Sequence, residues 1–360
     1  MLGVGGALGL CACVPDPAPT GRGGGPGRGD SGLGDGPETA VLATVSQDYA
    51  VGALATVDLS GWTVTDQITD LSGDPAVVVA GGHLFQLERY GFDVVRVFEP
   101  GDWSAPRVEF ALADLANPQD VAMCGPDAVI SQLGSDALAV YDPTTGLRAG
   151  SVDLSPWADA DGLPEATDLV DAGDGWIYVA VRNFDRDAGW ASAGGAVLEL
   201  SCDGLEITRE WAFDSPTLAL DPADPDTLLV TQPGGDVVLL DRPTGATRVV
   251  LEGGSMDGVI EQMVVHEGAA MGITVTPDYA YGVVCLDLAM GAAVARPTPD
   301  RYLISIAANA HGEAWVSART HWDAPEAPFG VQVWDIATCT EQTAGRPLQT
   351  LLAPYSVAFY

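Results

Sequence analysis

The stretch LAVYDPTTGLRA, residues 138–149, decides the fold because variants of it recur along the chain. It reads as an apolar β-strand that ends in an acidic residue, followed by a tight turn and a more polar strand. Further copies, some of them looser, occupy residues 55–64, 93–108, 197–208, 237–249, 283–294 and 331–342. The motif therefore occurs seven times and indicates a repeat protein.

A second repeated piece precedes most of these hairpins. It has a small or polar start, an apolar strand, a Gly or Asp turn and a second apolar strand, and copies occupy residues 74–87, 118–133, 166–181, 216–231, 261–275 and 303–318. Successive copies begin roughly 45 residues apart, which is the length of one four-stranded propeller blade. Each pair of pieces is therefore predicted to form one blade.

The two ends of the repeat region complement each other. The first hairpin, residues 40–68, lacks a leading strand, whereas the chain finishes with an unpartnered strand, APYSVAFY, at 353–360. If this strand is the innermost one of the first blade, the ring closes and no sheet edge stays unpaired. We therefore expect an all-β, seven-bladed β-propeller over residues 40–360, closed by pairing of the C-terminal strand with the N-terminal blade.

The V-x-D-x-x-x-G hairpins resemble those of the YVTN-type seven-bladed propellers of secreted bacterial proteins, and the resemblance covers residues 40–360. It implies the fold and a place in the bacterial cell envelope. Members of such families serve as surface antigens or capture ligands, so the resemblance does not imply one function.

The N-terminal region has the composition of an export signal followed by a tether. Residues 2–10 are apolar but too short to span a bilayer, which predicts a signal peptide over 1–12. LCAC at 10–13 resembles a bacterial lipobox, which implies acylation of Cys13. Residues 13–39, rich in Pro and Gly, are predicted to form a flexible tether. We expect an extracytoplasmic lipoprotein at the outer membrane or cell surface; the alternative is an ordinary periplasmic or secreted protein.

The charge balance excludes some partners. The chain has 50 acidic and 15 basic residues, all of the latter Arg, and a net charge of -35. Such a surface repels phosphate backbones and anionic lipids, so we expect no nucleic acid and no membrane contact beyond a lipid anchor. A hydrophobic content of 47% suffices for a core. We expect a monomer.

Candidate ligand-binding residues gather in the loops of one face. In a propeller, B–C loops and D–A connections emerge together, and here they include the long segments 153–168, 182–195 and 319–330. These segments mix aromatic rings with cations and carboxylates, as recognition patches do. The candidates are Trp157, Asp159, Asp161, Glu165, Arg182, Arg186, Trp190, Arg319, His321 and Trp322.

The segment WADADGLPEATD, residues 157–168, allows three interpretations. As a calcium loop it would bind the ion through Asp159, Asp161 and Asp168, although Trp157 stands where the first aspartate belongs. As the rim of a binding site it would contribute Trp157 and its carboxylates to a ligand. As a structural connection, its aspartates would cap turns and Arg186 would pair with nearby carboxylates.

A second candidate site lies at the mouth of the central channel. Polar residues at the start of the innermost strands are expected to form a collar there, either for a ligand or for ordered water. They are Gln119, Asp120, Asp168, Glu261 and Gln262.

Little in the sequence favours catalysis. His83, His266 and His311 fall at A–B turns of different blades, opposite the long loops, so they cannot converge on one metal. No nucleophile elbow, P-loop or dinucleotide motif is present. A propeller lyase or hydrolase is thus the least favoured class.

The cysteines are expected to form disulfides in an exported chain. Cys124, Cys202, Cys285 and Cys339 remain after processing, and Cys285 and Cys339 lie at corresponding places in neighbouring blades. These two are a candidate pair, and the pairing of the four stays open at this point.

The sequence therefore predicts an exported binding protein that recognises a small molecule, a glycan or an envelope protein through its loop-rich face. Capture of a nutrient or cofactor for an outer-membrane transporter is one such role, by analogy of fold alone. The alternative is a structural or adhesive envelope protein.

Overall fold

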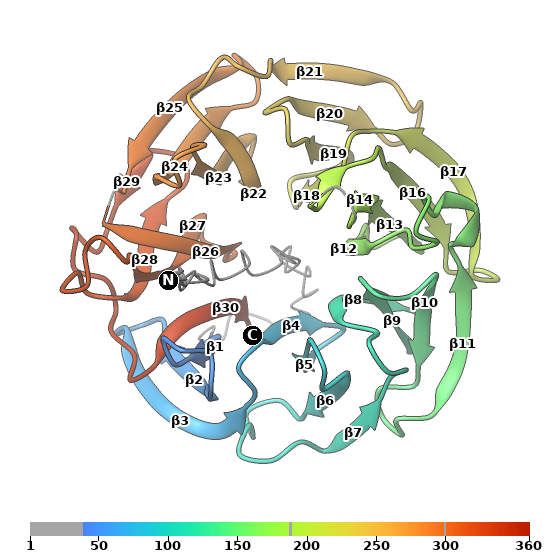
Figure 1. Ribbon diagram of the computed structural model, residues 1–360, viewed down its shortest axis with the longest axis horizontal. Helices are drawn as coiled ribbons and strands as arrows, with labels where there is room; N and C mark the ends of the chain where they lie inside the picture. The colour runs from blue at the N-terminus through green and yellow to red at the C-terminus, as the bar shows by residue number, and fades with distance from the viewer. Residues whose placement is uncertain (1–38, 187–188, 299) are drawn as a thin grey trace, which may run out of the picture.

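A computed structural model describes residues 39–186, 189–298 and 300–360. Within these ranges the chain forms seven four-stranded antiparallel sheets around a central axis, which confirms the all-β, seven-bladed propeller (Figure 1). The predicted signal peptide, Cys13 and almost all of the tether fall on residues 1–38, outside the described part of the chain.

Each blade has four strands, A to D from the axis outward, and a blade is numbered by its order in the chain. Blades one to three comprise β30 (Ala353–Phe359), β1 (Thr39–Val45), β2 (Gly52–Asp58) and β3 (Thr63–Leu71); β4 (Pro75–Ala80), β5 (His83–Glu88), β6 (Val94–Phe98) and β7 (Val108–Ala111); and β8 (Pro118–Cys124), β9 (Asp127–Gln132), β10 (Ala137–Tyr141) and β11 (Arg148–Asp153).

The remaining four blades follow the same plan. They comprise β12 (Ala166–Asp171), β13 (Trp176–Val181), β16 (Ala196–Ser201) and β17 (Glu206–Ala212); β18 (Thr217–Asp221), β19 (Asp224–Thr231), β20 (Val237–Asp241) and β21 (Thr247–Leu251); β22 (Val259–His266), β23 (Ala269–Val275), β24 (Tyr281–Asp287) and β25 (Ala292–Pro297); and β26 (Arg301–Ala308), β27 (Glu313–Thr320), β28 (Gly330–Asp335) and β29 (Thr340–Glu341). A short hairpin, β14 (Phe184–Asp185) and β15 (Ala191–Ser192), and a 3-10 turn, η1 (Ser155–Trp157), lie in connections.

The C-terminal strand closes the ring as predicted. Strand β30 pairs antiparallel with β1, with Ala40 opposite Phe359 and Leu42 opposite Val357. Two backbone hydrogen bonds of 2.8 and 2.9 Å between Thr39 and Tyr360 extend the pairing to the last residue. The first blade is therefore built from both ends of the propeller region.

The recurring acidic residue of the hairpin motif caps the C–D turn. In blade three, Oδ1 of Asp142 accepts hydrogen bonds from the backbone N–H of Thr144 at 2.8 Å and from its hydroxyl at 2.7 Å. Asp335 binds Thr338 in the same way in blade seven. The repeat is thus explained by the hydrogen-bonding needs of a tight turn rather than by a shared ligand.

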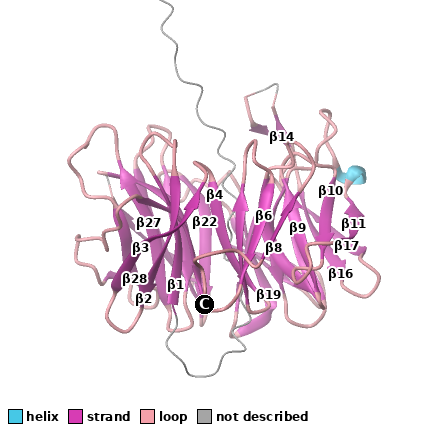
Figure 2. Cartoon of the chain, turned by 90° about the horizontal axis from the view of Figure 1, so that it is seen from below, coloured by secondary structure: helices cyan, strands magenta, loops and turns pink. Residues whose placement is uncertain are grey.

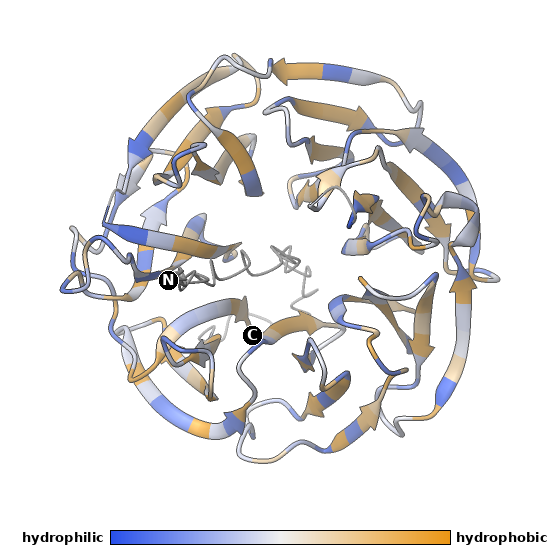
Figure 3. Cartoon of the chain, viewed as in Figure 1, coloured by the Kyte–Doolittle hydropathy of each residue, from blue (hydrophilic) through white to orange (hydrophobic). Residues whose placement is uncertain are grey.

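The core consists of the seven seams between neighbouring blades. Inner strands such as β4 are buried along their whole length, whereas the outer strand β17 alternates between exposed and half-buried residues. Figure 3 shows the same gradient, with polar segments concentrated on the outer strands. The period-two pattern of the outer strands follows from their having one solvated face.

Two disulfides join neighbouring blades. Cys285 pairs with Cys339, which confirms the candidate pair and links blades six and seven. Cys124 pairs with Cys202 and links blades three and four.

The ring has two different faces. B–C loops and D–A connections form one, the loop-rich face, on which hairpin β14–β15 stands at the top of Figure 2. A–B and C–D turns form the other, the turn face. In the described part of the chain, no helix has the length and apolar character needed to span a bilayer.

Candidate functional site

The loop-rich face carries all the exposed Phe, Tyr and Trp side chains of the described residues. Their exposed fractions run from 37% to 67%, and each lies in a B–C loop. They are Tyr49, Tyr90, Phe92, Trp190, Tyr279 and Trp322. The turn face exposes only Leu147 and Met290 among the large hydrophobic side chains of its described turns. Exposed aromatic side chains gathered on one face are typical of a recognition surface.

Two of these aromatic residues are presented by the same loop structure in different blades. In blade one, the Ser46 hydroxyl donates to Asp48 at 2.6 Å and accepts from the N–H of Ala50 at 3.1 Å. In blade six, Thr276, Asp278 and Ala280 repeat this arrangement. The intervening tyrosines, Tyr49 and Tyr279, are both exposed.

Both tyrosines, and also Trp190, adopt a left-handed backbone conformation. Their φ angles are 57°, 62° and 67° for Tyr49, Tyr279 and Trp190. This region is unfavourable for bulky side chains, and such strain is concentrated at functional sites in proteins. Twelve other non-glycine residues of the described chain, Trp62 and Leu205 among them, share this conformation, so exposure rather than backbone conformation distinguishes these three aromatic residues.

Arg319 is buried and stabilises the Tyr49 loop through hydrogen bonds rather than facing solvent. It is 2% exposed and donates to the carbonyl oxygens of Val45 at 3.3 Å and Ser46 at 2.9 Å. Its guanidinium carbon lies 4.4 Å from the centroid of the Tyr49 ring. This predicted ligand-binding arginine therefore positions an exposed aromatic residue.

Trp322 is the exposed member of an aromatic cluster between blades six and seven. Its ring centroid lies 4.2 Å from that of His321, 4.8 Å from that of Tyr302 and 6.3 Å from that of Tyr279. His321 is buried, and its Nδ1 accepts a hydrogen bond from the N–H of Asp323 at 3.2 Å. His321 therefore supports Trp322 from below.

A recess of about 170 Å³ opens beside hairpin β14–β15 and is lined by residues of blades four, five and six. Three predicted residues meet here, although they come from different segments: Arg182, Trp190 and Glu261. Nε of Arg182 donates to the Ser215 hydroxyl at 3.1 Å, and its guanidinium carbon lies 4.6 Å from the Phe184 ring centroid. Aromatic walls, hydroxyl groups and opposite charges suit a small polar ligand.

The acidic loop 157–168 is organised around Arg186. Asp159, Asp161 and Glu165 place one carboxylate oxygen each within 4.8 Å of one another, the one such set of three metal-ligating side chains among the described residues. Nε of Arg186 lies 3.1 Å from Glu165 Oε1 and 3.4 Å from Asp161 Oδ2. A guanidinium is therefore already in contact with two of the three carboxylates.

Burial raises the pKa of Glu165 to about 7, and the neighbouring Asp161 carboxylate acts in the same direction, while Arg186 and the N–H of Phe184 lower it. The first two aspartates also cap turns: Asp159 accepts from the N–H of Asp161 at 2.9 Å, and Asp161 accepts from that of Leu163 at 2.8 Å. These contacts support the structural interpretation of the loop.

Two further residues of the acidic segment point elsewhere. Trp157, half-buried in η1, donates its indole N–H to Glu210 on β17 at 2.6 Å and packs at the outer rim of blade four. Asp168 lies on β12, and its Oδ2 accepts from the N–H of Leu218 at 2.9 Å. The carboxylates that cluster are thus Asp159, Asp161 and Glu165, and Asp168, which the calcium interpretation required, is not among them.

Three of the five residues predicted to line the channel mouth bind the next blade instead. Besides Asp168, Asp120 accepts from the N–H of Leu169 at 2.9 Å, and Gln262 accepts from that of Ile306 at 3.3 Å. We call these side chains the blade latches. Gln119 is fully buried, and its amide group donates to Asn117, whereas Glu261 is half-buried in the recess.

Desolvation dominates the ionisation of the two acidic latches. Burial raises the pKa of Asp120 well above its ordinary value, and it raises that of Asp168 to about 6 against the opposing attraction of Arg182. Such shifts also occur in active sites, but here each carboxylate is aimed at a backbone N–H of the neighbouring blade.

The histidines lie where the sequence placed them. His83 begins β5, His266 ends β22 and His311 lies between β26 and β27, all at A–B turns on the turn face. They belong to three different blades, so they do not form one metal site with His321.

Sequence reasoning missed part of the recess and of the aromatic surface. Phe184, Ser192 and Ser215 line the recess, and Phe92 is 60% exposed. Their positions in loops of the loop-rich face were the available signal, but hydroxyl and Phe side chains carry no recognisable spacing.

No protein-family model and no curated protein sequence matches this chain. Among solved structures, a "putative 6-phosphogluconolactonase" of Bacteroides uniformis is similar with a TM-score of 0.63 and 11% identity, over 90% of this chain and 99% of the other. AztD of Citrobacter koseri is similar with a TM-score of 0.50 and 12% identity, over 90% and 98%. At such identities the likeness shows the fold alone.

The chain also matches the hydrazine synthase structure of Kuenenia stuttgartiensis, with a TM-score of 0.49 and 17% identity over 62% of this chain. It spans 64% of the length of that protein's matched chain. The similarity to the two structures with TM-scores of 0.63 and 0.50 supports the propeller architecture of the chain.

Proposed function

We propose that the protein is an extracytoplasmic binding propeller that holds a partner protein on its loop-rich face. The observation that carries the proposal is the gathering of every exposed Phe, Tyr and Trp side chain of the described residues in the B–C loops of that face. Aromatic residues dominate the energetics of protein interfaces because they bury large areas at small cost in side-chain entropy.

The breadth of the surface favours a macromolecule over a small ligand. The exposed rings belong to blades one, two, four, six and seven, so a partner that contacts several of them must cover much of the ring. The two inter-blade disulfides support an oxidising, extracytoplasmic compartment. The N-terminal signal motif and Cys13 support export and lipid anchoring, which remain part of the proposal.

The test compares a triple alanine variant with a double alanine variant. Each is used for affinity capture of partners from cell envelopes, with chemical cross-linking. Tyr49→Ala, Tyr279→Ala and Trp322→Ala together remove loop-face rings, whereas Leu147→Ala and Met290→Ala remove exposed hydrophobic side chains of the turn face. We expect the loop-face variant to lose at least about tenfold in recovery of the partner, equivalent to roughly 1.4 kcal/mol, and the turn-face variant to keep it. Equal recovery by both variants would refute the proposal.

A second candidate function rests on the recess at Arg182 and Trp190. Its aromatic walls and hydroxyl groups favour a small hydroxylated or zwitterionic ligand. A thermal-shift screen of sugars and amino acids tests it, because a bound ligand at about 100 times its Kd stabilises the fold by roughly 2.7 kcal/mol. The shift should disappear in Trp190→Ala; a shift that survives in this variant places the ligand elsewhere.

A further inference from the structure

The seven seams between blades are filled by different side chains. In six of them an aromatic ring packs in or against the hydrophobic cluster of the seam. Examples are the stacked pair Phe110 and Tyr141 between blades two and three, and Trp315 with Phe359 between blades seven and one. Because neighbouring blades diverge away from the axis, bulky side chains are needed to fill the outer part of each wedge.

The seam of blades five and six lacks such a filler. Its cluster consists of Ala, Val, Leu, Ile and Met side chains, with no aromatic residue and no cysteine among the described residues. A recess of about 490 Å³ opens at this seam on the turn face. This volume lies within the range of about 300–1,000 Å³ that is typical of small-molecule sites.

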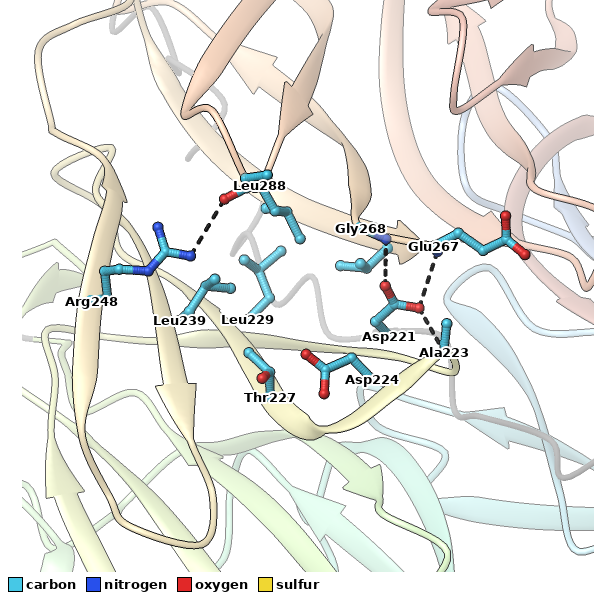
Figure 4. A pocket seen from close by; sticks show the side chains of 12 residues that line it. Asp221, Ala223, Asp224, Thr227, Leu229, Leu239, Arg248, Glu267, Gly268 and Leu288 are labelled. Carbon is cyan, nitrogen blue, oxygen red and sulfur yellow. Dashed lines mark hydrogen bonds between the residues drawn. The ribbon is translucent and has the colours of Figure 1, made fainter.

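The floor of this recess is apolar. Leu229, Leu239, Val265 and Leu288 come from both blades and line it, as the close view in Figure 4 shows for the three leucines. Leu229, Val265 and Leu288 are buried, so the floor is firmly packed from behind. At the edge, Asp221 accepts hydrogen bonds from the N–H groups of Glu267 and Gly268 and fixes the two A–B turns against each other.

The charges around the recess favour a cation. In the described part of the chain, the carboxylates of Asp224 and Glu267 make no side-chain hydrogen bond or ion pair. The Asp224 carboxylate is directed toward the leucines, whereas that of Glu267 points away from them (Figure 4). Arg248 lies at the opposite edge, where its Nη2 is 3.5 Å from the carbonyl oxygen of Leu288 (Figure 4). The net charge of -35 also concentrates cations at the surface.

We propose that this recess binds a planar, apolar molecule that carries an amine, with its rings against the leucine floor and its cation beside Asp224. The ligand would supply the aromatic ring that the other six seams hold as a side chain. The site is independent of the loop-rich face, because it lies on the opposite side of the ring.

Three related probes test the charge preference by calorimetric titration at low salt: tryptamine, indole and indole acetate. They share the ring system and differ in charge. We expect tryptamine to bind about three- to tenfold more tightly than indole, and indole acetate to bind most weakly. Failure of tryptamine to bind at millimolar concentration, or tighter binding of indole acetate, would overturn the proposal.

Two double variants locate the site. Asp224→Asn with Glu267→Gln removes the two carboxylates of the recess that make no hydrogen bond and should weaken tryptamine binding about three- to tenfold. Glu252→Gln with Asp257→Asn removes the same two charges from the same seam on the loop-rich face and should leave binding unchanged. Both variant proteins have the same net charge. Equal effects of the two variants would therefore show that only the overall negative charge of the protein attracts the cation, and would overturn the assignment of the binding site to this recess.

A third variant tests whether the recess is a hollow in the packing. Leu239→Trp places an indole where the ligand's rings would lie, so it should abolish tryptamine binding and leave the midpoint of thermal unfolding unchanged or higher. Undiminished binding by the folded variant would contradict the location. If this variant fails to fold, the pair of charge variants still decides the question.

Discussion

The side-chain carboxylate of Asp120 in β8 accepts a hydrogen bond from the backbone N–H of Leu169 in β12, 2.9 Å away, and so joins blade three to blade four. Asp168 binds the N–H of Leu218 in the same way one blade later. These latches lie where the register of strands A and B shifts, for example between Ala166 and Leu169. Among the described residues no backbone ladder joins one blade to the next, so packing and these buried hydrogen bonds hold the ring together near its axis.

Removing a latch is expected to destabilise the ring. Asp168→Ala leaves the buried N–H of Leu218 without its acceptor, at a cost of about 1–3 kcal/mol in the free energy of unfolding. Asp168→Asn keeps an oxygen in this position and should lose less. Urea unfolding at pH 7 measures both variants, and equal stability of Asp168→Ala and the parent protein would contradict the role of the latch.

The same residue predicts a pH dependence of stability. Its pKa is about 6 in the folded protein against an ordinary value of 3.8, so the native state binds more protons than the unfolded state between these values. The contribution of Asp168 to the free energy of unfolding is therefore fully present below about pH 4 and is lost as the pH rises through about 6. The loss amounts to on the order of 3 kcal/mol.

The control for this pH dependence is Asp168→Asn, which cannot titrate at this position. Other carboxylates also make stability depend on pH, because the pKa of Glu165 is raised and that of Asp142 is lowered, so the informative quantity is the difference in unfolding free energy between the two proteins. That difference should change between about pH 4 and pH 6 and be constant above. A difference independent of pH in this window would contradict the raised pKa.

Arg186 is predicted to take the place of a cation in the acidic loop. Its guanidinium occupies Asp161 and Glu165 and lowers the negative charge of the cluster, so millimolar calcium should shift the thermal midpoint of the parent protein little. In Arg186→Gln the three carboxylates lose this partner, and calcium at about ten times its Kd should then restore roughly 1.4 kcal/mol of stability. Equal calcium shifts in both proteins would show that the ion binds without competing with Arg186.

The fold could be predicted from the sequence because its signals are local and repeated. Turns such as that of Asp142 recur in blade after blade, and the unpaired strand at 353–360 leaves one way to close the ring. The topology of a propeller alone predicts which loops share a face. Trp190 and Trp322 were placed on the loop-rich face in this way, and both are exposed there.

The roles of individual charged residues could not be predicted in the same way. Arg319 and Asp120 were predicted to face a ligand or the channel, but each is buried against backbone groups of a neighbouring blade. Contacts across a seam join residues far apart in the sequence, for example 49 positions for Asp120 with Leu169 and 44 for Gln262 with Ile306. The recess between blades five and six was missed because it results from the absence of large side chains, which leaves no motif.

The disulfides are expected to contribute to stability because each closes a long loop across a seam. Cys124–Cys202 and Cys285–Cys339 span 78 and 54 residues. Removal of either pair by Ser substitution should cost about 2–5 kcal/mol. The midpoint of thermal unfolding with and without reductant checks this in the parent protein, and a protein whose midpoint is insensitive to reductant would contradict the pairing.

Closure by β30 is predicted to be essential for cooperative folding. Deletion of residues 353–360 removes the inner strand of blade one, leaves the edge of β1 unpaired and uncovers the buried side chains of Ala40 and Leu42. An exposed apolar edge promotes aggregation, so the truncated chain should lose its cooperative unfolding transition and associate. Calorimetry and light scattering measure these two properties.

A milder substitution in β30 distinguishes the effect of losing ring closure from the effect of losing core packing. Val357→Ala keeps the backbone of β30 and should cost about 1–3 kcal/mol while preserving a single transition. Adding the peptide of residues 353–360 to the truncated chain should restore the transition, because β1 still presents its edge. If the truncated chain unfolded cooperatively at the parent temperature without the peptide, the ring would be held by the seams alone, and pairing of the chain ends would be dispensable.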